Sequence, residues 1–280
     1  MKFIILLMTV LLQRQTRQEG YHRDKSWFVR WLPAATEAAS GNRDYVLYAL
    51  FVVLPCIFLS AILASLGGLV GGLISLVLQV VLFLYILGRD DYSQRFQRYQ
   101  ACWKREDYQA AYECAHHFLS VEAEANTHTP EQLHQQVQSA VLQAWFERFF
   151  IFVFWFLVLG IAGPLFCLLT LWFYKHTKRG WVNQVWRSLQ WIPVRLLAIT
   201  IALAGDFSAS FSKAMGYWFD FEVSPSEVLT TVVKENRDAQ CHSFSCDNAE
   251  SALMETNKLM FRCAVIWLLI VALLTLLVGF

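Results

Sequence analysis

Long stretches without any acidic or basic residue constrain this chain more than any other feature. They cover residues 45–87, 149–174 and 263–280. A bilayer core about 30 Å thick is crossed by roughly 20 apolar residues in a helix. Because backbone amides in lipid must hydrogen-bond within their own segment, these stretches must be helical. The sequence therefore predicts an all-α, polytopic membrane protein with four to five hydrophobic helices and a small cytoplasmic helical region.

The composition agrees with a membrane protein. Hydrophobic residues make up 56% of the chain and charged residues only 16%, against roughly 25% in soluble domains. The formal net charge of +1 argues against a nucleic-acid partner. The seven cysteines are an odd number, and most are isolated or lie on apolar segments, which is typical of reduced thiols. Cys241 and Cys246 form the one close pair, and with only His242 beside them they have too few ligands for a zinc site.

The hydrophobic stretches also set the domain organisation. Both flanks of the first stretch are rich in arginine and lysine, so the positive-inside rule places both in the cytoplasm. Lys258 and Arg262 directly precede the last stretch and favour the same side for residues 205–258. We predict a half-inserted helix with a basic linker (1–44), a transmembrane hairpin (45–88), a cytoplasmic helical region (89–148), a kinked span with a Pro-x-Arg helix (149–205), an amphipathic cytoplasmic segment (206–262) and a C-terminal transmembrane helix (263–280).

Helix starts can be placed inside two of these parts. In the cytoplasmic region, Asp107 opens one helix, and Thr129 and Pro130 mark the next as N-cap and first helical residue. In the hairpin, the glycine-rich segment 67–72 predicts a tight turn, with the second helix starting after Gly72. This segment has no lysine after it, so it is not a phosphate-binding loop of the P-loop type.

The middle stretch, 149–174, leaves two arrangements open. It contains Gly160 and Pro164, and a proline removes a backbone donor and kinks a helix. Either the stretch crosses the membrane, which places the basic loop 175–187 outside against the charge rule, or it is a broken, re-entrant pair of half-helices that returns to the cytoplasm. Its length favours crossing, whereas the basic loop favours return, and we interpret the stretch as crossing, with residues 189–204 coming back.

Arg195 is the most informative candidate site residue, because it lies in an otherwise apolar segment. That segment is either a span with a buried arginine or a helix lying in the interface. An ionisable group at membrane depth is costly and suggests a function by default. The structural alternative is that Arg195 reaches the headgroups or pairs with a carboxylate. The functional hypothesis is that it binds an anionic lipid or lipid-linked phosphate, and the candidate set is Arg195, Arg148, Glu147, Arg187 and Asp206.

Metal binding is the other chemistry that the spacing suggests. Two Glu-x-x-His pairs, Glu113 with His116 and Glu131 with His134, have the ligand spacing of di-iron bundles. Such sites also need carboxylates from two further inward-facing helices. We interpret both pairs as solvated helix surface and predict no metal site.

Several short motifs, in their order along the chain, resemble the AmpE family, inner-membrane proteins linked to β-lactamase induction. The family belongs to the wider adenosylcobinamide-phosphate synthase superfamily, whose Pro-x-Arg-Leu segment is similar to residues 193–196 here. The resemblance covers nearly the whole length. The motifs are Glu106-Asp107-Tyr108-Gln109-Ala110-Ala111, Phe154-Trp155, Gly163-Pro164, Trp191-Ile192-Pro193-Val194-Arg195-Leu196 and Ala202-Leu203-Ala204-Gly205.

Departures from the synthases bear on catalysis. Their Glu-Asn-x-x-Asp motif corresponds here to Gln143, Ala144 and Glu147, so one acid remains. Their Asn-Thr-Leu-Asp motif corresponds to Leu171 through Tyr174, which are all apolar or aromatic. Joining an amine to a carboxylate at nucleotide expense needs acids for metal and proton transfer. The resemblance therefore implies the scaffold without the activity, with no catalytic residue and no cofactor.

The resemblance implies a non-enzymatic regulatory or sensor protein of the bacterial inner membrane, linked to β-lactamase induction and cell-wall status. Its expected partners are membrane lipids, an anionic lipid or cell-wall-derived ligand, and a protein that contacts residues 89–148. The alternative is a membrane synthase that is degenerate or has an altered substrate. A small transporter subunit is a third reading, based on the broken span at Gly163-Pro164.

Overall fold

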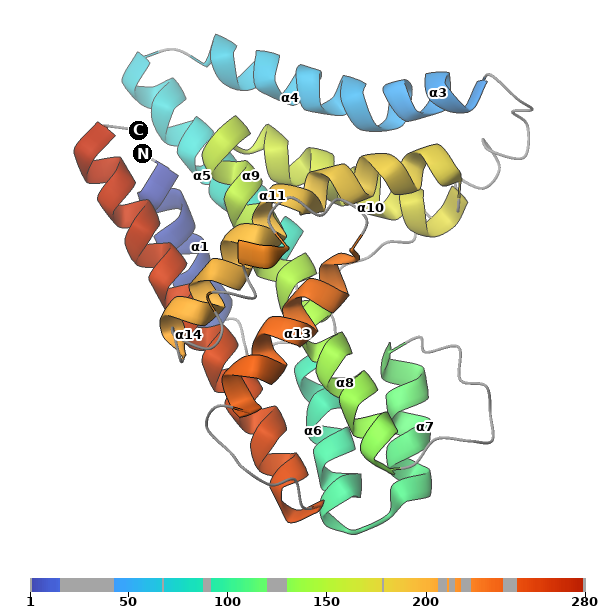
Figure 1. Ribbon diagram of the computed structural model, residues 1–280. Helices are drawn as coiled ribbons and strands as arrows, with labels where there is room; N and C mark the ends of the chain where they lie inside the picture. Colours follow the sequence, from blue (N-terminus) through green and yellow to red (C-terminus); the bar gives the residue numbers. More distant parts are fainter. Residues whose placement is uncertain are drawn as a thin grey trace. The chain divides into compact units, whose positions relative to one another are not determined.

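A computed structural model shows the protein as helices throughout the part of the chain that it describes. The described residues are 2–15, 43–66, 68–87, 92–119, 130–177, 179–205, 211, 215–217, 223–238 and 246–278. The elements are α1 (Lys2–Gln15), α3 (Arg43–Tyr48), α4 (Leu54–Ser65), α5 (Gly68–Leu87), α6 (Tyr92–Lys104), α7 (Tyr108–Leu119), α8 (Pro130–Trp145), α9 (Ile151–Leu159), α10 (Ala162–Thr177), α11 (Gly180–Ala204), α13 (Pro225–Asp238) and α14 (Cys246–Val278), with π-helical turns η2 (Ala49–Val53) and η3 (Phe146–Phe150) (Figure 1).

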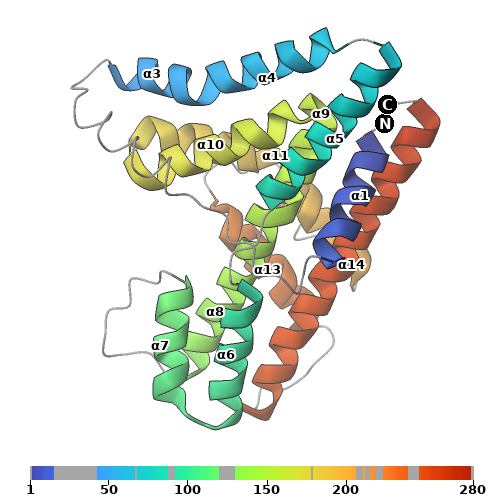
Figure 2. The same cartoon turned by 180° about the vertical axis from the view of Figure 1, so that it is seen from behind.

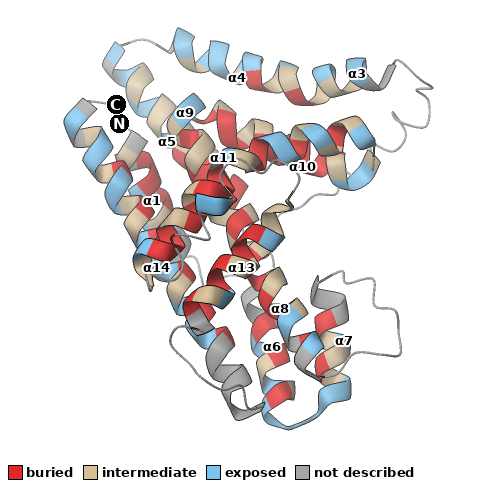
Figure 3. Ribbon diagram, in the orientation of Figure 1, coloured by how far each residue is buried: buried red, intermediate tan, exposed pale blue. Residues whose placement is uncertain are grey.

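Among the described residues, five helices are long and apolar enough to cross a membrane, which confirms the all-α polytopic fold. The first, Tyr45–Ser65, has the highest mean hydropathy, 2.7, and only 11% of its most apolar window is buried (Figure 3). Val70–Leu87 and Gln135–Leu159 come next along the chain. The last two are Gly180–Ala204, whose mean hydropathy is the lowest at 1.2, and Leu253–Thr275. An apolar helix that buries so little of itself in protein requires lipid around it.

The chain forms two compact units. Unit 1 contains residues 1–89, 149–190 and 268–280, and unit 2 contains residues 90–148 and 191–267. In unit 1, α1 packs along α5, while α10 packs on α4, η2 and α9 (Figures 1 and 2). The two helices of the predicted hairpin are therefore joined by a turn but pack mainly on different partners.

The hairpin turn differs in one detail from the prediction. Helix α5 begins at Gly68, where φ is +82°, and not after Gly72. A Cβ atom added to Gly71 would lie 2.9 Å from the carbonyl carbon of Leu66. The glycines thus serve a positive φ and a close backbone approach at the turn, and the helix runs through Gly71 and Gly72.

The break in the middle stretch comes from glycine and not from proline. Helix α9 ends before Gly160, whose φ is +65°, a conformation that glycine adopts readily. A Cβ atom on Gly163 would collide with the backbone carbonyl of Trp155, so glycine allows α9 and α10 to approach closely. Pro164 lies in the first turn of α10, where a missing backbone donor costs little.

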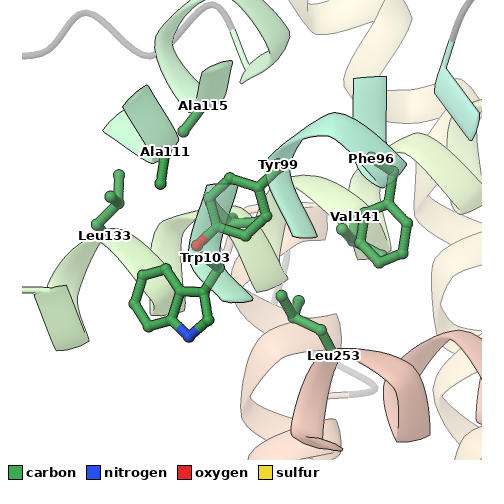
Figure 4. Packing of buried hydrophobic residues seen from close by; sticks show 9 residues of the cluster. Phe96, Tyr99, Trp103, Ala111, Ala115, Leu133, Val141 and Leu253 are labelled. Carbon is green, nitrogen blue, oxygen red and sulfur yellow. The ribbon is translucent and has the colours of Figure 1, made fainter. Parts of the chain in front are cut away.

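Unit 2 has its own hydrophobic core, built from α6, α7, α8 and the start of α14 (Figure 4). Helix α13 packs on α8. Helix α7 begins after Asp107, whose Oδ1 accepts from the Ala110 backbone N–H at 3.0 Å, and α8 begins at Pro130, so both predicted helix starts are confirmed. The core residues are Phe96, Tyr99, Trp103, Ala111, Ala115, Leu133, Val137, Val141 and Leu253.

Candidate functional site at the Pro-x-Arg segment

Arg195 is buried inside α11, with 3% of its surface exposed. Its Nε donates to the backbone carbonyl of Tyr217 at 3.2 Å, and its Nη1 donates to the carbonyl of Trp191 at 3.1 Å. Its guanidinium carbon lies 4.5 Å from the centre of the Trp191 ring. The arginine therefore ties α11 to the segment that follows it.

This geometry explains how a charged group is tolerated there. Carbonyl oxygens carry partial negative charge, and hydrogen bonds that involve a charged donor are stronger than neutral ones. The aromatic face adds cation–π attraction, worth about 2 kcal/mol or more where water is excluded. The contacts give Arg195 a structural task within unit 2, and the hypothesis that it also binds an anion stays a prediction.

Pro193 creates a second polar feature in the same helix. It lies inside α11, and because proline has no N–H, the carbonyl of Leu189 loses its usual helical donor four residues on. The indole Nε1 of Trp155 on α9 donates to that carbonyl at 3.1 Å. The Leu189 carbonyl thus gains a donor from outside its own helix, which offsets the loss.

Two further contacts hold the end of α11. The indole Nε1 of Trp267 donates to the Thr200 hydroxyl at 3.0 Å, and that hydroxyl donates to the Leu196 carbonyl at 2.7 Å. Gly205 lies so close to the buried amide of Asn236 on α13 that a Cβ atom would overlap it. The apolar end of α11 is therefore fixed by specific polar contacts with α14 and a close approach to α13.

The other predicted site residues lie on different elements. Glu147 and Arg148 lie on η3 and are half-buried. Glu147 accepts from the side-chain amide of Gln143, at 2.7 Å. Arg187 is exposed on α11 and belongs to unit 1, whereas Arg195 belongs to unit 2. Asp206 lies outside the described residues.

At the positions aligned with the synthase acids, the structure places mostly apolar or aromatic side chains. Leu171 is buried, and Tyr174 and Ala144 are half-buried. The described residues contain no group of three or more His, Cys, Asp or Glu that could hold a metal. The side chains of His116, Glu131 and His134, like Cys241, lie outside what the structure describes.

Sequence reasoning found Arg195 but missed its partners. The spacing of Trp191 and Arg195, four residues apart on one helix face, is a signal that predicts their contact. No such signal marks the bond from Arg195 to Tyr217 or the bond from Trp155 to Leu189, because these bonds join segments 22 and 34 residues apart. The π-helical turn that carries Glu147 and Arg148 was also missed, since no local sequence rule marks it.

The family described as "Regulatory signalling modulator protein AmpE" matches residues 1–279. The chain is similar to Protein AmpE of Shigella flexneri, with 24% identity over 230 residues that cover 76% of this chain and 78% of that protein. No solved structure matches the chain. The match over the whole chain shows that this multi-pass membrane protein belongs to the AmpE family.

Proposed function

We propose that this protein is a non-enzymatic regulator in the bacterial inner membrane that adjusts β-lactamase induction according to cell-wall status. The observation that carries the proposal is the family match over residues 1–279. The five helices of membrane-spanning length support the location. A regulator of this kind acts through binding and conformational bias and needs no reacting groups.

The residues in the synthase positions support a role without catalysis. Leu171 cannot bind a metal or carry a proton, and Gln143 is engaged with Glu147. The remaining carboxylate, Glu147, is therefore a hydrogen-bond acceptor within its own helix. Because a scaffold alone does not carry a reaction, the resemblance to the synthases gives this chain an architecture and no activity.

We propose that a protein partner contacts the α6–α7 tip, which we define as residues 104–107. All four of its side chains are exposed, and they carry charges of both signs: Lys104, Arg105, Glu106 and Asp107. The hydrophobic core of unit 2 holds the two helices beneath the tip. A rigid, charged surface of this kind suits recognition of a partner by charge complementarity.

The test measures β-lactamase activity before and after an inducing β-lactam in a strain that lacks this gene. We expect the induction ratio to change on deletion and to return to the parental value with the intact gene. A Lys104→Glu, Arg105→Glu variant should be present in the membrane at the parental level and fail to restore the ratio. Lys234→Gln, which removes an exposed charge from α13, is the matched control for the tip. Identical induction curves with and without the gene would remove the proposal, whereas full activity of the tip variant would remove only its partner surface.

A further inference from the structure

Aromatic contacts in unit 1 join the start of the first span to the corner between α10 and α11. The Tyr45 and Trp181 rings are stacked, with centroids 4.6 Å apart. Tyr48 packs edge-on against Trp181 at 5.3 Å and against Phe173 at 5.4 Å. Its hydroxyl is 3.0 Å from the Thr170 hydroxyl. Residues 43–48 and 173–181 therefore lie at the same membrane face.

Contacts within unit 2 relate the start of the last span to the helical region before the middle stretch. The side-chain amide of Gln138 on α8 donates to the Thr256 hydroxyl on α14 at 3.0 Å. Trp145 on α8 donates to the Asn257 side chain at 2.7 Å, and Leu253 belongs to the core formed with α6 and α7. The segment before the last span is therefore on the same side of the membrane as α6 and α7.

The number of membrane crossings before and after α11 then indicates whether α11 itself crosses. The span Tyr45–Ser65 and the helix α5 cross as a pair, so residues 43–48 and α6 share a side. By the two sets of contacts, the start of α11 and the start of α14 share that side as well. A helix that begins and ends on one side does not cross, although α11 is 25 residues long.

The surface of α11 agrees with this conclusion. In its first half, Val182, Trp186 and Leu189 are buried on one stripe. Gln184, Arg187 and Ser188 are exposed on the opposite stripe. Three polar side chains on an outward face are costly in hydrocarbon, whereas an amphipathic helix in the interface places them in the headgroup layer.

We propose that α11 lies in the cytoplasmic interface and that a basic face around its start binds anionic phospholipid headgroups. The basic face consists of Lys175 at the end of α10, Arg179 between α10 and α11, and Arg187 on α11, all exposed. Trp181, whose ring stacks on Tyr45, belongs to the same stretch of chain. Aromatic rings and basic side chains are the groups that gather at the headgroup level, and basic groups favour the cytoplasmic leaflet. The pair α9 and α10, broken at Gly160, then goes out and returns. This is the second of the two arrangements that the sequence left open.

The first test locates the polar stripe. Single cysteines at Gln184 and Ser188 in the full-length protein are labelled with an impermeant maleimide in right-side-out and inverted vesicles, and the signal of the parent protein is subtracted. Lys104→Cys at the α6–α7 tip is the cytoplasmic reference. We expect positions 184 and 188 to react in inverted vesicles only, as the reference does. Reaction in right-side-out vesicles, or in neither kind, would show that α11 enters or crosses the hydrocarbon.

The second test measures the lipid. The thermal midpoint of the protein in phosphatidylcholine bilayers is followed as phosphatidylglycerol is added. In the Arg179→Gln, Arg187→Gln variant, the amount of phosphatidylglycerol that gives the half-maximal rise should increase about five-fold for each arginine. The control variant Lys104→Gln, Arg105→Gln removes equal charge from the tip and should follow the parent. Equal curves for all three proteins would refute lipid binding. A full rise produced by inorganic phosphate alone would assign the basic face to free phosphate and overturn the proposal.

Discussion

Arg195 shows how this chain accommodates a positive charge inside a largely apolar helix. The guanidinium is buried, but two of its N–H groups donate to the carbonyls of Tyr217 and Trp191, and its plane lies by an indole ring. Only an arginine has a planar fork that reaches two acceptors while stacking on a ring. The residue that sequence reasoning selected for function is therefore first of all a connector between α11 and the segment after it.

We predict that Arg195→Met lowers the thermal midpoint of the detergent-solubilised protein. Each hydrogen bond from a charged donor contributes about 1.5–3 kcal/mol, and the substitution removes both of the guanidinium bonds. Arg195→Lys should fall in between, because one ammonium cannot reproduce both bonds. The matched control is Lys234→Met on the exposed face of α13, which should change stability by less than about 0.5 kcal/mol. A parental midpoint for Arg195→Met would show that the contacts carry no stability.

At the scale of single elements, α6 and α7 form the part of the chain that local rules predicted best. The sequence predicted a helix start at Asp107, and Asp107 caps α7, since a side-chain oxygen there satisfies a free N–H of the first turn. Glu106 adopts a positive φ of 58° in the connecting turn, which no pattern indicated. The turn brings Cys102 and Cys114 together, with sulfurs 4.0 Å apart, although both were expected to be isolated.

We predict that mild oxidation with a copper–phenanthroline catalyst joins Cys102 and Cys114. A disulfide needs its sulfurs at about 2.05 Å, which a change of side-chain rotamer from 4.0 Å can reach. Burial, and next to it the bond with Cys102, raises the pKa of the Cys114 thiol. Because the thiolate is the reacting form, the rate should increase as the pH rises from 7 to 9. Peptide mass spectrometry identifies the product, which Cys102→Ser must abolish. If Cys114 instead cross-links elsewhere at the same rate, the packing of α6 on α7 is not as described.

At the scale of the whole molecule, the sequence predicted which parts meet lipid, because a charge-free run of sufficient length permits little else. It did not predict how the helices pair. That α5 packs on α1 and α4 on α10 depends on side-chain fit between segments far apart in sequence. The start of α5 at Gly68 and the break at Gly160 were misplaced for a related reason. A glycine or proline shows where the backbone can bend, whereas tertiary packing selects where it does.

The proposed course of the chain predicts that residues beyond the last span lie outside the cytoplasm. If α11 does not cross, α14 leaves the side that holds the α6–α7 tip. Alkaline phosphatase fused after Phe280 should therefore be active, and a green fluorescent reporter at the same place should stay dark. The same reporters inserted at the α6–α7 tip give the opposite pattern. A fluorescent fusion after Phe280 would mean that α11 crosses.

The bond from Trp155 to the Leu189 carbonyl has a consequence for how the family can vary. The indole donates to a carbonyl that receives no amide from its own helix, because residue 193 of α11 is proline. A relative with alanine at position 193 would close its own helix there, and the tryptophan would be left with a desolvated donor. Substitutions at positions 155 and 193 should therefore occur together across homologues, although the two positions are 38 apart in the chain.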